Sequence, residues 1–102
     1  SAPARGNFVP RASKVGNNRI FVVWQSRIEK RGKIAGDDIF GRFINFTGEL
    51  SPIIRFTDDS QNDAPSVFVY HNKLHIIYLK RKPYWGLFYS IYSENGVPIK
   101  RK

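Results

Sequence analysis

The chain repeats itself, and this repeat constrains the fold more than any other feature of the sequence. Two pairs of segments match: RIFVVWQ at 19–25 with KLHIIYL at 73–79, and DIFGRFI at 38–44 with GLFYSIY at 86–92. In each copy, a turn that ends in glycine follows the second segment. A repeat of about 50 residues is typical of supersecondary units that stack because one unit cannot bury its faces alone. The 102 residues hold two such units.

Short apolar runs rich in Val, Ile, Phe, Tyr and Trp, bounded by Gly, Pro, Asn and Asp, predict strands rather than helices. They divide the chain into a flexible leader at 1–7, a first repeat at 8–57, a linker at 58–64 and a second repeat at 65–102. Each repeat is predicted to hold four antiparallel strands, at about 8–15, 19–26, 38–46 and 51–57, then at about 65–71, 73–80, 86–93 and 97–101. The predicted fold class is therefore all-β.

The second strand of each repeat is apolar on both of its faces. Alternating positions along 19–26 and along 73–80 are apolar in both registers. Such strands are expected in sheets that are covered on both sides, as in a blade stacked between two other blades. Trp24 and its counterpart Tyr78 are accordingly predicted to be core residues rather than site residues.

The two repeats differ most between their second and third strands. The first copy is predicted to have a long loop at 27–37, which carries Gly32 and Gly36, whereas the second has a short loop at 81–85. Variable loops on a constant strand frame are where repeat proteins place recognition.

Three motifs of the first copy carry a family resemblance: VVW at 22–24, DIFG at 38–41 and GEL at 48–50. They are similar to the repeats of large secreted bacterial and archaeal β-propeller proteins, which often read VVW, DIYG and GxL. The second copy departs from the pattern, with Tyr78 in place of the tryptophan and Gly86 in place of the aspartate. The resemblance implies two four-stranded propeller blades, a binding role and an extracellular or cell-surface location.

Two blades are too few for a propeller, which has about four to eight. Two would leave open sheet faces, which are a hydrophobic liability. Three outcomes follow. The chain is a piece of a longer propeller, it assembles with identical chains as two-bladed lectins do, or it closes on itself as a small β-sandwich or barrel.

The net charge of +9 favours polyanionic partners, although well-spread basic residues also serve solubility. Cysteine is absent, so no disulfide can stabilise the small core. No apolar run reaches the 18 or so residues of a membrane span, so no span is expected.

The acidic residues predict no enzyme, because nearly all of them lie in predicted turns, where Asp and Glu usually cap the backbone. The one combination that could resemble a glycosidase pair is Asp37–Asp38 with Asp63. We expect no metal or other cofactor. His71 and His75 lack a third ligand nearby, and the acidic residues at 59–63 lack the glycine and closing glutamate of a calcium loop.

The strongest candidate ligand site is the loop that holds Lys80, Arg81, Lys82, Tyr84 and Trp85. Exposed Trp and Tyr rings stack on sugars or bases, and Lys and Arg hold anionic groups. The alternative is that Trp85 packs into the sheet and the cations are solvated. The sequence thus predicts a non-catalytic binding or scaffolding module that engages protein, whether further blades or identical chains, or carbohydrate. The rival prediction is a basic β-sheet protein that binds nucleic acid or another polyanion.

Overall fold

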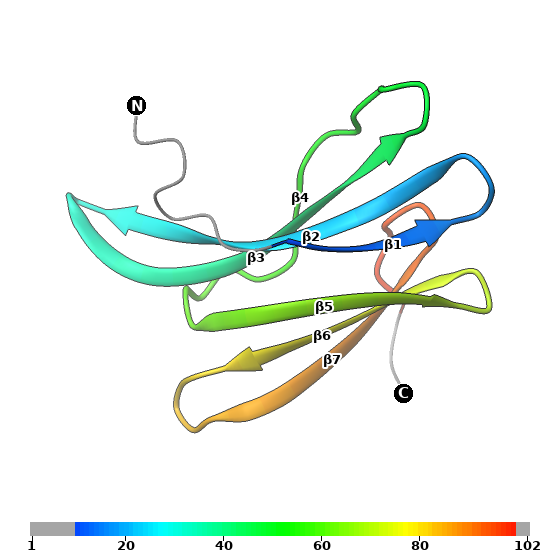
Figure 1. Cartoon of the computed structure of the whole chain (residues 1–102). Helices are drawn as coiled ribbons and strands as arrows, with labels where there is room; N and C mark the ends of the chain where they lie inside the picture. The colour runs from blue at the N-terminus through cyan, green and yellow to red at the C-terminus, as the bar shows by residue number, and fades with distance from the viewer. Residues whose placement is uncertain (1–9, 100–102) are drawn as a thin grey trace.

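The computed structural model of the chain describes residues 10–99, and the predicted leader at 1–7 lies outside this range. The described residues form seven antiparallel strands and no helix, so the all-β prediction is confirmed (Figure 1). The strands are β1 (Arg11–Val15), β2 (Arg19–Lys30), β3 (Lys33–Asn45), β4 (Ile54–Arg55), β5 (Asn62–Tyr70), β6 (Lys73–Lys80) and β7 (Gly86–Ser93). They form a first sheet in the order β1-β2-β3-β4 and a second in the order β5-β6-β7.

The long loop predicted at 27–37 is instead a β-ribbon. β2 and β3 continue through it and stay paired from Arg19↔Asn45 to Lys30↔Lys33, with a bulge at Ile28 and Glu29. The ribbon turns at Arg31 and Gly32, which both have positive φ (54° and 78°), the combination that suits a two-residue hairpin. The loop prediction was wrong because this segment is too polar to show an apolar run, yet a tight turn can pair it.

The fourth strand of each repeat is shorter than predicted. In the first repeat the segment 51–57 forms only the two-residue strand β4, and Leu50, just before the segment, makes an isolated bridge to Ile44. In the second, the described part of 97–101 makes only a Tyr92↔Pro98 bridge, and its remainder lies outside the described residues. The proline in each segment cannot donate to a ladder. The described sheets therefore have four and three strands rather than four each.

The second and third strands of the two repeats are paired in the same register. Trp24 lies opposite Phe40 in the first sheet, and Tyr78 lies opposite Phe88 at the matching place in the second. Both aromatic pairs are stacked, with ring centroids 6.4 Å and 6.0 Å apart and an interplanar angle of 18° in each. The matching segments of the sequence thus build matching structure.

The turn that follows each third strand is also the same in both sheets. Gly48 N donates to the Asn45 carbonyl over 2.8 Å, and Gly96 N donates to the Ser93 carbonyl over 2.9 Å. Both glycines have positive φ, of 98° and 85°. The repeat read from the sequence therefore holds at the level of individual hydrogen bonds.

Each sheet has two faces, because side chains alternate along a strand and directly opposed residues point the same way. In the first sheet we name them the Phe21 face (Val15, Phe21, Val23, Phe43) and the Trp24 face (Ile20, Val22, Trp24, Phe40, Ile44). Their counterparts in the second sheet are the His75 face (Phe68, Tyr70, His75, Ile77, Leu79, Leu87, Tyr89, Ile91) and the Tyr78 face (Val67, Val69, Leu74, Ile76, Tyr78, Phe88, Tyr92). The Phe21 face thus corresponds to the His75 face, and the Trp24 face to the Tyr78 face.

The hydrophobic core lies between the Phe21 face of one sheet and the Tyr78 face of the other. The buried cluster joins Val15, Phe21, Val23 and Phe43 to Val67, Leu74 and Ile76. Strand β5 contacts β1, β2 and β3, and β6 and β7 extend away from it (Figure 1). The two repeats therefore pack through faces that are not equivalent, in a head-to-tail manner.

Gly41 is a position where the core approaches the backbone closely. An added Cβ would lie 2.7 Å from the Phe21 ring and 2.8 Å from the Val22 carbonyl oxygen. We expect Gly41→Ala to lower the free energy of unfolding by about 1–3 kcal/mol, the usual effect of overpacking, as measured by urea denaturation. Gly86→Ala is the control, since its nearest contact would be 3.3 Å away on a Phe88 ring edge. Equal losses in the two variants would contradict the packing around Phe21.

Candidate functional site

The His75 face of the second sheet is an open apolar surface. Phe68, Tyr70, Leu87 and Tyr89 are all exposed, and Leu87 has 71% of its surface accessible. Ile77 and Ile91, beside them, are half-buried. Contiguous apolar surface of this kind usually marks a site of protein interaction.

His75 anchors the centre of this face and is itself 7% exposed. Its Nε2 lies 3.3 Å from the Tyr70 carbonyl oxygen, which can only accept, so this nitrogen carries the hydrogen. In the neutral ring Nδ1 therefore accepts from the Tyr89 hydroxyl, to which it is hydrogen-bonded. The ring also stacks on Phe68, with centroids 4.7 Å apart and an interplanar angle of 8°. Both ring nitrogens are thus occupied, and the aromatic side chains are held in fixed places.

The Trp24 face of the first sheet is the second apolar surface outside the core, and it is partly covered, with the Arg55 guanidinium carbon 5.5 Å from the centroid of the Phe40 ring. Ile20, Val22, Trp24, Phe40 and Ile44 are half-buried, and none of them belongs to the core cluster. The prediction that Trp24 and Tyr78 are both core residues is therefore wrong for Trp24 and right for Tyr78, which packs against the core. The reason is that the equivalent faces of the two sheets have different surroundings.

The predicted ligand site at 80–85 has two parts. The first two side chains are bound to neighbouring residues of the chain, and the others are exposed. Lys80 forms an ion pair with Asp59, and Arg81 donates to the Ser60 carbonyl over 3.0 Å and lies 3.4 Å from an oxygen of Asp63. These two cations hold the loop to the segment between the sheets.

The other three side chains of the predicted ligand site point to solvent. Lys82 is exposed, and Tyr84 and Trp85 have 83% and 68% of their surfaces accessible. The alternative that Trp85 packs into the sheet does not hold. Ligand binding by this loop stays a prediction, and three rather than five of its predicted side chains are available for it.

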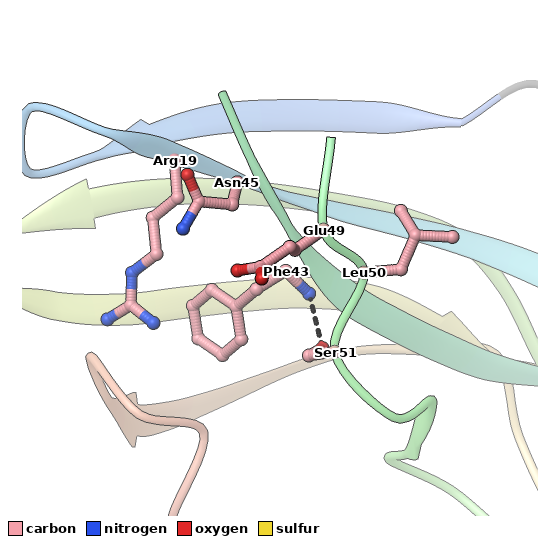
Figure 2. A pocket seen from close by; sticks show the side chains of 6 residues that line it. All are labelled: Arg19, Phe43, Asn45, Glu49, Leu50 and Ser51. Atoms are coloured by element: carbon pink, nitrogen blue, oxygen red, sulfur yellow. Dashed lines mark hydrogen bonds between the residues drawn. The ribbon is translucent and has the colours of Figure 1, made fainter. Parts of the chain in front are cut away.

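Residues within 10–99 line shallow cavities at the ends of the sheets. One, of about 190 Å³, is lined by Arg19, Phe43, Asn45, Glu49, Leu50 and Ser51, and Figure 2 shows these side chains around the bond from Phe43 N to Ser51 Oγ. Another, of about 260 Å³, is lined by Ile34, Ala35, Gly36, Gln61, Arg81 and Lys82. The first has one carboxylate in its lining and the second has none, so neither has the paired acids of a glycosidase.

Asp38 is the most completely buried acid, with 0% of its surface exposed. It accepts hydrogen bonds from Arg55 Nη2 and Thr57 Oγ1, both at 2.7 Å, and from Ser60 N and Asn62 Nδ2, both at 2.9 Å. Burial alone would raise the pKa of Asp38, but these donors together outweigh it and hold the pKa below its usual value. This carboxylate therefore ties β3 to the segment that leads into the second sheet.

Asp37 and Asp63, two of the three acids in the predicted glycosidase-like combination, lie near each other. Gln25 Nε2 donates to Asp37 Oδ2 over 2.9 Å and to Asp63 Oδ1 over 3.3 Å. Burial raises the pKa of Asp63, and Asp37 adds to this while Arg81 opposes it. The Gln25 side-chain amide thus links Asp37 of β3 to Asp63 of β5 and joins the two sheets. Both carboxylates accept a hydrogen bond from it.

The comparisons with known proteins give no relative: no family model, no curated protein and no solved structure matches this chain. Within residues 10–99 there is no helix long and apolar enough to cross a membrane. The likeness to propeller repeats therefore remains an expectation from the sequence.

Proposed function

We propose that this chain is a non-catalytic scaffolding module of β-propeller type, whose open sheet faces bind further β-sheet units. One observation carries the proposal. The two repeats pack through non-equivalent faces, which leaves the His75 face exposed and the Trp24 face half-buried and outside the core cluster.

When two non-equivalent faces pack together, the equivalent face on each unit is left outside the contact. In a head-to-tail arrangement every added unit covers one open face and brings another, until the array closes or is capped. The exposed His75 face and the half-buried Trp24 face are the two ends of such an array. The physical reason to bind is the removal of apolar surface from water.

The acidic residues support binding rather than catalysis. Asp38 is held by four donors, and Asp37 and Asp63 share Gln25, so these carboxylates have structural partners. Carbohydrate or polyanion binding through Lys82, Tyr84 and Trp85 would be a separate property of the exposed loop.

The test is the mass of the full chain by light scattering over a range of concentrations. We expect assemblies larger than one chain, and we expect them to persist from about 0.1 to about 1 M NaCl, where exposed charges are screened. Lysine at either open face, in Val22→Lys or in Ile77→Lys, should reduce the assembly while the far-UV spectrum stays that of a folded β protein. A wild-type chain that remains a monomer at every concentration would overturn the proposal.

Two binding assays decide between the alternatives at the exposed loop. A polyanion-binding protein should bind an oligonucleotide, with an affinity that falls steeply as salt increases. A lectin should bind sugars independently of salt and lose this binding in Trp85→Ala.

A further inference from the structure

We infer that the occupant of the open His75 face is the Trp24 face of a second copy of this chain. This inference rests on the proposed scaffolding function and names its partner. The template is the contact inside the chain, where the Tyr78 face of the second sheet covers the Phe21 face of the first.

The equivalent positions of the two repeats predict which residues form the contact between copies. The register equates Val22 with Ile76 and Val23 with Ile77. Inside the chain, Ile76 packs in the cluster that contains Phe21 and Val23. In the contact between copies, Val22 of the second chain takes the place of Ile76, and Ile77 takes the place of Val23.

The two open faces also differ in chemistry in a way that suits each other. The His75 face presents aromatic rings, with Phe68, His75 and Tyr89 held together by stacking and by hydrogen bonds. The Trp24 face presents the branched side chains Ile20, Val22 and Ile44 around the Trp24–Phe40 stack. Aromatic side chains contribute large apolar area at cores and interfaces, so the ring-rich His75 face suits an apolar partner of this kind.

The middle of the Trp24 face carries a cation, because Arg42 lies on β3 between Phe40 and Ile44. Arg42 lies opposite Val22 and is fixed by two hydrogen bonds to the Ser51 carbonyl, of 2.9 Å and 2.6 Å. A guanidinium beside a face rich in tyrosine and phenylalanine can make cation–π contacts. A contact between two Trp24 faces would instead bring two such cations together. Charge therefore also favours the pairing of unlike faces.

Variants that each block a different face test the pairing of unlike faces directly. Ile77→Lys closes the His75 face and leaves the Trp24 face open, whereas Val22→Lys does the reverse. We expect each variant alone to be monomeric, and an equimolar mixture to form a one-to-one dimer with twice the monomer mass. The double variant Val22→Lys/Ile77→Lys is the control, because it should pair with neither.

The outcomes separate this inference from the proposed function. If the wild type assembles but either single variant forms a homodimer, or if the mixture stays monomeric, the inference is wrong and the scaffolding function stands. If the wild type is monomeric, both are wrong.

A second measurement does not depend on the folding of the lysine variants. The chain has two tryptophans, Trp24 and Trp85, so Trp85→Phe leaves Trp24 as the only indole reporter. We expect its emission to shift to shorter wavelength as the concentration of the chain rises, because the Trp24 face becomes covered. Assembly without any such shift would overturn the inference.

Discussion

Replacing Ile76 with lysine is expected to unfold the chain, whereas the same change at Val22, its equivalent in the other repeat, is expected to leave it folded. Ile76 has 0% of its surface exposed and lies in the cluster between the sheets. An unpaired ammonium group buried there costs several kcal/mol, a large part of the stability of about 5–15 kcal/mol that a domain usually has. Val22 lies on the open Trp24 face, where a lysine can reach water. Far-UV circular dichroism and urea denaturation measure the difference.

On the opposite faces of β2 and β6, lysine should be more destabilising in the first repeat than in the second. Val23 has 0% of its surface exposed, and its counterpart Ile77 is half-buried on the His75 face. Val23→Lys should therefore unfold the chain, and Ile77→Lys should cost far less. Similar losses at all four positions would mean that both faces of both sheets are covered, as in a closed structure.

Asp38→Ala is expected to lower the free energy of unfolding by about 3 kcal/mol, the scale for removing one partner of a buried, hydrogen-bonded charge. The change leaves Asn62 Nδ2 and the Ser60 amide without the acceptor they share, and frees Arg55 from its 2.7 Å ion pair. Asp58→Ala, at an exposed position of the next segment, is the control and should change stability by less than about 0.5 kcal/mol. Urea denaturation at pH 7 measures both, and equal effects would contradict the structural role of Asp38.

The pH dependence of this difference follows from the direction of the pKa shift. The pKa of Asp38 is lower in the folded chain than its usual value of 3.8, which applies to the unfolded chain. Its contribution is therefore complete above about pH 5 and is lost as the pH falls through the folded pKa. The difference in the free energy of unfolding between the wild type and Asp38→Ala should be constant from pH 5 to pH 7 and should shrink below about pH 4. A difference that grows as the pH falls would contradict the lowered pKa of Asp38 in the folded chain.

The parts of the fold that depend on apolar pattern could be predicted from the sequence. The matching segments at 19–25 and 73–79 became β2 and β6, and the stacked pairs at Trp24 and Tyr78 repeat one contact in both sheets. The expectation of open sheet faces came from counting the repeats, and the exposed His75 face agrees with it. Which face of each sheet is covered could not be predicted, because both faces of both strands are apolar.

The parts that depend on polar contacts over long distances in the chain could not be predicted. The ribbon at 27–37 is decided by one tight turn at Arg31–Gly32, and the sequence there looks like a loop. The Asp38 network joins residues about 20 positions apart, and the only signal for it was the density of acidic and amide residues around 57–63. The ligand site at the basic loop stays a prediction, and the pairing of Lys80 and Arg81 with acids of the predicted linker could be seen only in the fold.

Nuclear Overhauser effects between the sheets, measured on the monomeric double variant Val22→Lys/Ile77→Lys, test whether unlike faces pack together. The Phe56 and Tyr92 rings have centroids 4.7 Å apart and join the two sheets, so they should show strong cross-peaks. Phe21 should likewise show cross-peaks to Leu74 or Ile76, which share its cluster. Cross-peaks from Phe21 or Val23 to His75 or Tyr89 would contradict this packing, because they would place equivalent faces of the two repeats against each other.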